Sequence, residues 1–484
     1  METKATVGID AIAFYVPSLF VDIERLAERR SIAYAKLNKG LGLVKMAVPD
    51  VHEDAASFGA NALCKLIRDS NLDPRSIGRI YMGTESALDA SKPTATYAID
   101  AVEKELEEEF GPRCFMNCDV VDMTFACVGA VDALHNSLDW VRGDRNRKAI
   151  VLASDVAKYD LSSPGEYTQG AGAVAILVSQ DPSVLAITDN WGVATKSEGD
   201  FFKPRRVFDK AELLIETAHI LGQTLSREDA ELLMQNNNSS FWNLSGSQLE
   251  VFKEEPVFDG PFSNECYRAR ITEALENFGQ QAQINYLEEW QHLVFHLPYA
   301  YQARRMFVEN WLQWMNNNNR IQEVYDELGV PEHGTSMEWI KKVSKSEAYL
   351  MFVNERIAPG EKASSVIGNM YTASIFMSLL SLLNDALDRG IQLEGQKIAF
   401  FSYGSGSKSK VFQAVICSGW QAAISGAPLF EILDQRQEID VDTYEKLHKN
   451  ESKSIINGDR IARLQTISDK PESQGLRRYG FGFS

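Results

Sequence analysis

The stretch "VVDMTFACVGAVDALHNSLDWV", residues 120–141, joins a short strand-like run to a helical pattern. Its first residues are apolar and β-branched, which favours a strand. Four apolar residues then recur at intervals of three or four, namely Val131, Leu134, Leu138 and Val141. That spacing is typical of a helix with one buried face. We therefore expect a strand, a turn and a helix in succession, with Cys127 at or just before the helix N-terminus.

The same order of elements occurs twice. After this helix come two apolar, strand-like runs, "KAIVLASD" (148–155) and "GAGAVAILV" (170–178). Later in the chain, "GNMYTASIFMSLLSLL" (368–383) reads as a turn and an apolar helix, followed by the strand-like runs "KIAFFSYGSGSK" (397–408) and "VFQAVICS" (411–418). Near-continuous apolar strands that alternate with helices are typical of a layered α/β unit. The recurrence indicates an internal duplication.

Two earlier segments extend the pattern. Residues 6–15 read as a strand that ends before Pro17, and "RIYMGTES" (79–86) reads as a strand followed by a tight turn. Residues 50–70 begin with acidic residues and then carry apolar residues at helical intervals, which predicts an amphipathic helix.

The region between the two halves has a different composition. Residues 205–254 are polar and poor in strand pattern, and residues 316–319 are four asparagines between helical stretches. We expect surface insertions or a cap over the core. Residues 451–484 are polar and contain glycine, which predicts either a tail or a surface wrap. The predicted parts are an N-terminal half at 1–184, a C-terminal half at 185–430 with an inserted cap at about 203–284, and a C-terminal tail at 431–484.

The charge balance argues against nucleic acid as the main ligand. The 484 residues include 49 lysines and arginines against 67 acidic residues, a formal net charge of −18. Nucleic acid affinity comes mainly from clustered basic side chains that neutralise phosphates. An anionic ligand must therefore be met by a local basic cluster.

The apolar runs are too short to span a bilayer, since residues 171–178 are broken by glycine and residues 375–383 by serines. The first residues, "METKATVGID", lack a basic stretch followed by an apolar core. We expect a soluble, cytoplasmic protein with no membrane partner. The six cysteines lack the close paired spacing of a zinc ribbon or a disulfide scaffold, which predicts free thiols.

Cys127 has two interpretations on position alone. A helix N-terminus lowers the pKa of a cysteine and so favours the reactive thiolate, which suits a nucleophile. Free cysteines are also among the most buried residue types and most of them are inert, which suits a packing role. A nucleophile further requires a base or an orienting imidazole.

Candidates for that partner are His296 and Glu85. "HLVFHLPY" (292–299) places two histidines four residues apart, and His296 lies at the end of a buried strand beside a proline, where it is either functional or a satisfied core residue. A zinc site is disfavoured, because the run lacks a metalloprotease glutamate and a third ligand. Glu85 directly follows a predicted strand, where it is either a base with a raised pKa or a surface turn residue.

Two glycine turns, "TQGAGA" (168–173) and "YGSGSK" (403–408), lack the order of a phosphate-binding P-loop. We expect their glycines to let the backbone approach a ligand or to donate N–H groups to an oxyanion.

Nine segments carry a family resemblance: "VGIDAIAFYVP" (7–17), "GLGLVKM" (40–46), "IGRIYMGTES" (77–86), "DMTFACVGAVDAL" (122–134), "TQGAGAVA" (168–175), "PVFDGPFSNECY" (256–267), "FHLPY" (295–299), "GNMYTAS" (368–374) and "FSYGSGS" (401–407). Their order and spacing resemble those of hydroxymethylglutaryl-CoA synthase, a thiolase-superfamily enzyme. The resemblance extends over residues 6–420. It implies an α/β fold with a duplicated thiolase-like αβαβα five-layer core, a helical or irregular insertion in the C-terminal half, and a homodimer.

The resemblance also implies an acyltransferase. Members of the family condense acetyl-CoA with acetoacetyl-CoA through an acetyl-S-cysteine intermediate, and hydrolysis then gives 3-hydroxy-3-methylglutaryl-CoA and CoA. That reaction belongs to the mevalonate route to isoprenoids. The CoA thioesters are substrates, so no cofactor and no metal site are expected.

The family roles carry over to matching positions. Cys127 matches the cysteine that takes the acetyl group, Glu85 the general acid/base, and His296 the histidine that positions the thioester and ketone of the second substrate. The resemblance implies substrate-binding roles for Tyr159, Asn369, Ser405, Asp155, Asp200, Thr168, Tyr371, Arg304 and Arg305. Of these, Tyr159 matches a tyrosine beside the nucleophile, and the two aspartates match residues with a less direct part.

The chain departs from the family in two places. Tyr301 stands five residues after His296, where the family has a lysine that meets a CoA phosphate. Arg304 and Arg305 fall where the family has basic residues, so we expect them to hold the nucleotide or pantetheine end. The segment 205–254 is long for the family, and the sequence gives no functional account of it.

Two rival functions are weighed against this one. The nearest is a homologue that depends on an acyl carrier protein and adds an acetyl unit to a β-ketoacyl chain during polyketide β-branching. The tyrosine at position 301 and the basic turn "GSGSKSK" leave it open, because a carrier protein is acidic. A thiolase-fold binding or scaffold protein without turnover is disfavoured, because all three catalytic positions are filled.

Overall fold

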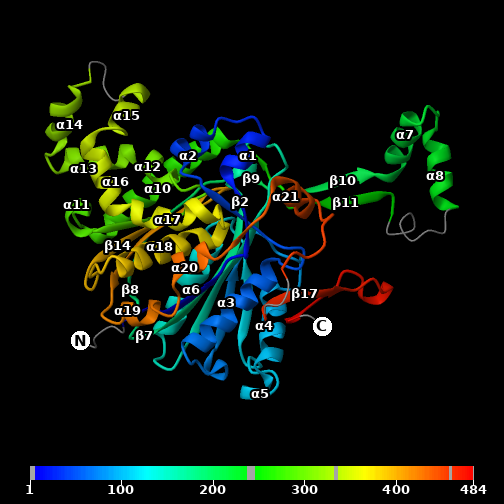
Figure 1. Cartoon of the computed structure of the whole chain (residues 1–484), viewed down its shortest axis with the longest axis horizontal. Coiled ribbons are helices and arrows are strands. Elements are labelled where there is room, and N and C mark those ends of the chain that lie inside the picture. The colour runs from blue at the N-terminus through cyan, green and yellow to red at the C-terminus, as the bar shows by residue number, and fades with distance from the viewer. Residues whose placement is uncertain (1–5, 237–245, 332–335, 457–459, 483–484) are drawn as a thin grey trace. The chain divides into compact units, whose positions relative to one another are not determined.

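The computed structural model describes residues 6–236, 246–331, 336–456 and 460–482. The chain divides into two compact units, both drawn in Figure 1. The main unit comprises the residues up to 200 and those from 259 onward, and the inserted unit comprises residues 201–258.

One large sheet organises the main unit. Within the described residues its strands follow the order β13-β14-β15-β8-β1-β7-β6-β4-β5. Their bounds are Val7–Tyr15 for β1, Arg79–Gly83 for β4, Asp119–Met123 for β5, Ala149–Ala157 for β6, Gly170–Gln180 for β7, Leu185–Thr195 for β8, His292–Phe295 for β13, Lys397–Gly404 for β14 and Lys408–Ile416 for β15. The strands predicted from the sequence are therefore present.

The two halves of the sheet repeat one topology. In the first half, β1 pairs antiparallel with β7, β7 antiparallel with β6, and β6 parallel with β4. In the second half, β8, β15, β14 and β13 pair in the same sequence of directions. The halves meet where β1 pairs with β8, at Gly8 with Ala186 and Ile9 with Leu185. Within the described residues, β5 has no counterpart in the second half.

Alternating side chains of the large sheet face three of the four apolar clusters that the described residues form. The central cluster combines α6 (Gly129–Arg142) and α18 (Ser374–Asp388) with Val151 of β6 and Phe400 of β14. The next residue along each strand points the other way, since successive strand residues face opposite sides. Ile150 packs with α3 (Ala55–Asp69) and α4 (Thr94–Glu105), whereas Phe401 packs with α10 (Gly260–Ala282). The predicted duplicated αβαβα five-layer core is confirmed.

α3 shows one difference from the sequence prediction. Asp54 caps its N-terminus in a capping box with Ser57. An amphipathic helix was predicted, but almost every residue of α3 is buried, including the polar Asn61. Asn61 exchanges two hydrogen bonds with the backbone of Ala462, at 2.7 and 3.1 Å, so the face predicted to meet solvent is covered by chain from far along the sequence.

That cover is the C-terminal hairpin of β17 (Ala462–Ile467) and β18 (Arg477–Phe481). Tyr479 of the hairpin is buried and donates a hydrogen bond to Asp54 at 2.6 Å. Figure 1 shows the hairpin beginning beside α4. The described part of 451–484 thus packs against the first half of the chain.

The remaining elements of the main unit complete its outer layers. A small sheet orders β16 (Gln437–Glu438), β2 (Leu19–Asp22) and β3 (Lys45–Val48). The remaining helices are α1 (Ile23–Arg29), α2 (Tyr34–Leu41), α5 (Glu107–Phe110), α11 (Tyr286–Glu289), α12 (Gln302–Met306), α13 (Val308–Asn317), α14 (Ile321–Leu328), α15 (Met337–Val343), α16 (Glu347–Arg356), α17 (Ala358–Ile367), α19 (Trp420–Ile424), α20 (Leu429–Asp434) and α21 (Val441–His448). None of the described helices has the length and apolar character needed to cross a bilayer.

The inserted unit contains paired strands, which the helical or irregular, strand-poor insertion predicted from the sequence did not include. β10 (Arg205–Asp209) pairs antiparallel with β11 (Gln248–Phe252), and α7 (Lys210–Ile220) and α8 (Arg227–Gln235) lie between them in sequence. β9 (Phe201–Phe202) pairs with β12 (Val257–Phe258) at its base. Both pairings join short strands that are far apart in sequence, so no local sequence pattern predicts them. Part of the predicted unit falls on residues 237–245, outside the described residues. The predicted cap at 203–284 also includes α10, which packs in the main unit.

Candidate active site

Cys127 and Glu85 come together although 42 residues separate them. Glu85 follows the end of β4, and Cys127 precedes α6 by two residues. The Cys127 thiol donates a hydrogen bond to Glu85 Oε1 at 2.9 Å. Cys127 is 8% exposed, and Ala126 before it has φ +38°, a strained conformation for a residue with a side chain. The turn predicted at Cys127 is therefore a tight one that presents the sulfur to a carboxylate.

Two glycines allow strands from both halves to reach this turn. A Cβ on Gly83, the last residue of β4, would lie 2.1 Å from the Ala130 amide nitrogen. A Cβ on Gly404, the last residue of β14, would lie 2.7 Å from the Phe125 carbonyl oxygen. Neither contact leaves room for a side chain. The glycine turn after β14 thus packs directly against the Cys127 turn.

Asp155, a fully buried carboxylate in β6, connects the two halves at the site. Its Oδ1 accepts hydrogen bonds from the Glu85 amide at 2.8 Å and the Thr84 hydroxyl at 3.0 Å. Its Oδ2 accepts from the amide of Thr372, which lies just before α18, at 3.0 Å. Charged acceptors make strong hydrogen bonds in a dry interior. The predicted site residue Asp155 therefore holds the Glu85 loop against the second half.

Tyr159 and Tyr371 are buried, and the charges of Cys127 and Glu85 act on both phenols. Burial raises the pKa of Tyr159, and the nearby charges of Cys127 and Glu85 raise it further. The pKa of Tyr371 lies well above its usual value for the same causes, burial being the largest. Both phenols are therefore neutral donors near neutral pH. Tyr371 has φ +42°, so backbone strain occurs on both sides of the site.

Asn369 and Thr168 form the support behind these tyrosines. Asn369 Oδ1 accepts hydrogen bonds from the Tyr371 amide at 2.8 Å and the Ser374 hydroxyl at 3.1 Å. The Asn369 amide donates to the Thr168 carbonyl oxygen at 3.0 Å. The Thr168 hydroxyl donates to Gly165 at 2.8 Å. The amide oxygen of Asn369 therefore fixes the turn that carries Tyr371.

His296 follows β13 and is 1% exposed. Burial lowers the pKa of its imidazole to about 3, so the ring is neutral near pH 7. The backbone of His296 is fixed by the Phe401 carbonyl and by the Tyr267 hydroxyl, each at 2.9 Å. Its Nδ1 is buried without a hydrogen-bond partner among the described residues. A neutral ring with an unused nitrogen is suited to hydrogen bonding with a ligand.

Tyr267 relates His296 to the nucleophile. The pKa of its phenol is raised mainly by burial, and also by the charges of Tyr299 and Cys127. Tyr267 therefore lies in the field of Cys127 while it holds the carbonyl of His296. Sequence reasoning missed this residue, because a tyrosine inside α10 has the same pattern as a core residue.

The Ser405 turn is held by Asp200, which is fully buried. Asp200 Oδ1 accepts from the Gly406 amide at 2.8 Å, and Oδ2 accepts from the Tyr403 hydroxyl at 2.8 Å. Its Oδ2 also accepts from the Ser263 hydroxyl at 3.2 Å. Asp200 therefore binds the Tyr403 side chain before Ser405 and the Gly406 amide after it.

The two arginines expected to hold the nucleotide or pantetheine end have different environments. Arg304 forms a two-armed ion pair with the buried Glu361, and its guanidinium lies 3.9 Å from the centre of the Tyr301 ring. Arg305 is exposed, and its Nη1 donates to the Tyr299 hydroxyl at 3.3 Å. Arg305 is therefore accessible to a ligand phosphate, whereas Arg304 is engaged in packing the loop after β13.

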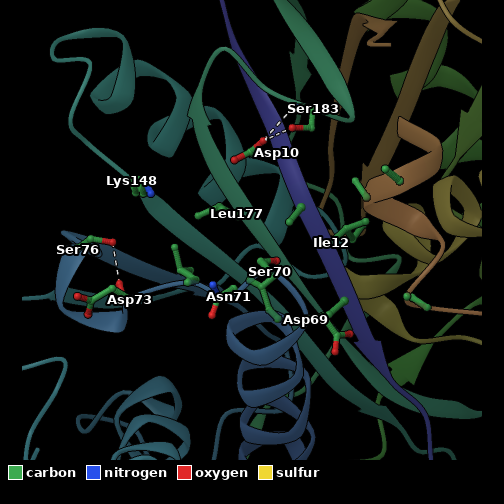
Figure 2. A pocket seen from close by; sticks show the side chains of 18 residues that line it. Asp10, Ile12, Asp69, Ser70, Asn71, Asp73, Ser76, Lys148, Leu177 and Ser183 are labelled. Carbon is green, nitrogen blue, oxygen red and sulfur yellow. Dashed lines mark hydrogen bonds between the residues drawn. The ribbon is translucent and has the colours of Figure 1, made fainter. Parts of the chain in front are cut away.

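A separate cavity of about 550 Å³ lies on the main unit between β1, β7 and the end of α3 (Figure 2). Its lining includes Asp10, Asp73 and Lys148. Asp10 accepts hydrogen bonds from the amide and hydroxyl of Ser183 at 3.0 and 2.7 Å. None of the described residues predicted for the site lines this cavity.

Comparison with known proteins gives one family. Residues 3–183 match the family described as hydroxymethylglutaryl-coenzyme A synthase N terminal, and residues 248–461 match its C-terminal counterpart. The chain is 28% identical to the hydroxymethylglutaryl-CoA synthase of Haloferax volcanii over 457 residues, covering 92% of this chain and 91% of that protein. It is 27% identical to that of Enterococcus faecalis, covering 91% of each.

Solved structures agree on the fold. A structure described as MvaS in complex with 3-hydroxy-3-methylglutaryl coenzyme A is 27% identical, with a TM-score of 0.76, over 99% of this chain and all of that one. The HMG synthase of the curacin biosynthetic pathway has a TM-score of 0.71 over 98% of this chain and all of that one. At 20% identity, the latter shows the fold alone.

Proposed function

The chain belongs to the hydroxymethylglutaryl-CoA synthase family of acyl-transferring condensing enzymes, and on that premise we propose that it joins acetyl-CoA to acetoacetyl-CoA and releases 3-hydroxy-3-methylglutaryl-CoA. The observation that carries the proposal is the 2.9 Å contact between the Cys127 thiol and the Glu85 carboxylate at a helix N-terminus. A nucleophile and a base within hydrogen-bond reach are the minimum for acyl transfer followed by proton abstraction.

In the first step, Cys127 Sγ attacks the thioester carbon of acetyl-CoA. The new Sγ–C bond forms as the bond to the CoA sulfur breaks, and the thiol proton leaves with the CoA thiolate. The N-terminus of α6 stabilises negative charge that develops on the attacking sulfur, and exchange of one thioester for another is an energetically even step. N–H groups of the Cys127 turn and the Ser405 turn are the candidate donors to the oxyanion.

In the second step, the Glu85 carboxylate removes a methyl proton from the acetyl-cysteine. The carbanion attacks the ketone carbon of acetoacetyl-CoA, a carbon–carbon bond forms, and the alkoxide takes the proton from Glu85. His296, neutral at the working pH, donates a hydrogen bond that orients and polarises the ketone. Asp155 keeps Glu85 in reach through its hydrogen bond to the Glu85 amide.

In the last step, water attacks the carbonyl carbon bound to Cys127. The C–S bond breaks, the thiol is regenerated with one proton from the water, and the product leaves as a free carboxylate at one end and a CoA thioester at the other. Hydrolysis of a thioester is strongly downhill, so this step makes the sequence irreversible. We assign the reaction to the mevalonate route in the cytoplasm.

The partner chain proposed is a second copy of the protein. β5 is the last strand of the sheet, and within the described residues its outer edge has no paired strand. Val121 of β5 and Met116 before it are exposed. An open edge with apolar side chains favours pairing with another strand, and a two-fold contact pairs β5 with itself. A monomer by light scattering at micromolar concentration contradicts this assignment.

The test of the activity is CoA release measured with purified protein, acetyl-CoA and acetoacetyl-CoA, each alone and then together. We expect release of CoA above the hydrolysis background only with both, and 3-hydroxy-3-methylglutaryl-CoA as the product by mass spectrometry. Absence of that product with both thioesters contradicts the proposal.

A carrier protein as the source of the second substrate is the alternative, and one observation favours it. Tyr301 replaces a phosphate-binding lysine, and its ring is covered by the Arg304 guanidinium, so neither residue is free for a CoA phosphate. An acetoacetyl carrier protein run beside acetoacetyl-CoA distinguishes the two. A specificity constant higher for the carrier protein supports the alternative.

A further inference from the structure

The backbone of Tyr159 is connected to helix α21, near the other end of the chain, directly at its carbonyl and through Gln169 at its amide. The Tyr159 amide donates to Gln169 Oε1 at 2.6 Å, and Gln169 Nε2 donates to the Tyr444 hydroxyl at 2.6 Å. The Tyr159 carbonyl oxygen lies 2.7 Å from His448 Nε2. A carbonyl only accepts, so His448 carries its proton on Nε2. Tyr444 and His448 lie four residues apart and therefore on one face of α21.

The contact between the Tyr159 amide and Gln169 is the end of a directed chain of hydrogen bonds. The Tyr444 hydroxyl accepts from Gln169 and donates to Glu166 Oε1 at 3.2 Å. Glu166 is buried and takes two hydrogen bonds from Arg30, at 2.8 and 2.7 Å. Arg30 also binds Glu445 of α21 at 2.6 Å. A buried ion pair fixes the direction of every donor in the chain, as is expected for a polar network in a dry interior.

The ring of Tyr159 is confined as well. A Cβ on Gly165 would lie 2.2 Å from Tyr159 Cδ1, so the ring packs flat on the Gly165 backbone. The phenol lies in the field of Cys127 and Glu85. A shift of the Tyr159 backbone therefore moves the phenol relative to the nucleophile, because the Gly165 backbone restricts the ring on one face.

We propose that α21 is a positioning element for the acyl site, with Tyr444 and His448 as positioning residues that hold the phenol of Tyr159 beside Cys127. The inference rests on the proposed function for its effect on turnover, but its effect on the reactivity of the Cys127 thiol does not depend on which substrate is used. One direct hydrogen bond from His448, 289 positions away, and a second connection that runs from Tyr444 through Gln169 are more than packing of a terminal segment requires.

The experiment compares Tyr444→Phe, His448→Leu and His448→Gln in the full-length protein. The matched control is Asp442→Asn, on the exposed face of α21, where Asp442 pairs with Arg29. Glutamine places an N–H where His448 Nε2 lies, so it retains the donor. Thermal unfolding of each variant separates loss of fold from loss of positioning.

The first readout is the rate at which iodoacetamide alkylates Cys127, followed by peptide mass spectrometry against pH. A neutral phenol beside the sulfur favours the thiolate, so its displacement raises the midpoint of the profile. We expect Tyr444→Phe and His448→Leu to raise that midpoint by about half a pH unit, with His448→Gln and Asp442→Asn unchanged.

The second readout is acetylation of Cys127 by acetyl-CoA. We expect about a tenfold slower rate in Tyr444→Phe and His448→Leu, with the KM for acetyl-CoA within about twofold of wild type. Unchanged alkylation and acetylation in both variants overturn the inference, as does an equal loss in Asp442→Asn or a loss that only follows the unfolded fraction. If the wild type alkylates normally but takes no acetyl group, the proposed function fails and the alkylation profile still decides the inference.

Discussion

The two halves of the main unit place different chemistry at equivalent positions. After β4 the first half carries Glu85, and after β13 the second half carries His296. Before α6 stands Cys127, and before α18 stands the turn of Asn369 and Tyr371. In the proposed reaction the first half supplies the groups that exchange bonds and protons, and the second half supplies neutral hydrogen-bonding groups. Under that proposal, duplication of the fold lets one copy act on the reacting bond and the other bind the reacting carbonyl.

The environments of the paired positions explain the division. The Glu85 carboxylate accepts a hydrogen bond from the Cys127 thiol, and the Glu85 amide donates one to Asp155. Among the described residues, the hydrogen bonds that hold His296 involve its backbone, and its Nδ1 has no partner there. Burial keeps the histidine neutral. A residue whose side chain is satisfied by protein is set for proton transfer within the site, and one with an unused nitrogen is set for a ligand.

Replacement of Cys127, in the first half, is expected to have the largest effect on activity. We expect Cys127→Ala to abolish both acetylation and condensation, a loss of at least about 10⁴-fold, because the sulfur is the atom that carries the acyl group. Radiolabel from acetyl-CoA measures the first activity and CoA release the second. Cys118→Ala, a half-buried thiol in the same half, is the control and retains both. Label retained by Cys127→Ala contradicts the assignment.

Replacement of Glu85 separates the two steps. We expect Glu85→Ala to retain acetylation within about tenfold, because the helix N-terminus favours the thiolate without a base. Condensation falls by about 10³-fold or more, because carbanion formation needs the carboxylate. Single-turnover assays report each step. A Glu85→Ala protein that is folded but unable to take the acetyl group contradicts the division of roles.

Replacement of His296 tests whether the second half acts on the second substrate and not on acetylation. We expect His296→Ala to lower kcat/KM for acetoacetyl-CoA by about 10²-fold, since a neutral donor to the ketone is lost from a dry site. Acetylation from acetyl-CoA alone should stay near the wild-type rate. His296→Gln, which retains an N–H, is expected to recover part of the loss. An equal loss of acetylation would show that His296 takes part in the acetylation step, and would contradict this division of roles.

The pH dependence of stability gives the smallest effect. Burial lowers the pKa of His296 to about 3, and burial with the charge of Lys410 lowers that of His135 in α6 to about 4. The ordinary histidine pKa is 6.5 in both cases. Below pH 6.5 the unfolded chain binds protons that the folded chain does not, so the free energy of unfolding falls as the pH falls, until about pH 4 for His135 and about pH 3 for His296.

Each histidine contributes a slope of up to about 1.4 kcal/mol per pH unit in that window. Urea unfolding at pH 7, 6 and 5 measures it, with His296→Gln and His135→Gln compared with wild type. We expect either variant to flatten the acid side of the profile. An unchanged slope in His296→Gln shows that the folded protein binds a proton at His296 and is inconsistent with the neutral ring.

The sequence predicted the local framework of the site, because strand and helix patterns are local. The turn at Cys127, the strand before Glu85 and the strand before His296 were all visible in the order of apolar residues. The carboxylate and the sulfur meet only because parallel strands β4 and β5 bring their ends together, which the resemblance implied and the pattern did not.

Long-range contacts could not be predicted from the sequence. The hydrogen bond from Tyr267 to the His296 carbonyl joins a helix to a loop. The hydrogen bond from His448 to the Tyr159 carbonyl joins residues 289 positions apart. The ribbon of β10 and β11 is equally hidden, since short paired strands with mixed polarity have no period that marks them. Arg304 was expected at a phosphate, but its partner Glu361 lies 57 residues away.

The most direct test of the account is peptide mass spectrometry of the wild-type protein after brief mixing with acetyl-CoA alone and an acid quench. The account predicts one acetyl group per chain, located on the peptide that contains Cys127, and its disappearance when acetoacetyl-CoA is added. No acetyl group on that peptide, or one on another cysteine, contradicts the central claim that this sulfur carries the acyl group.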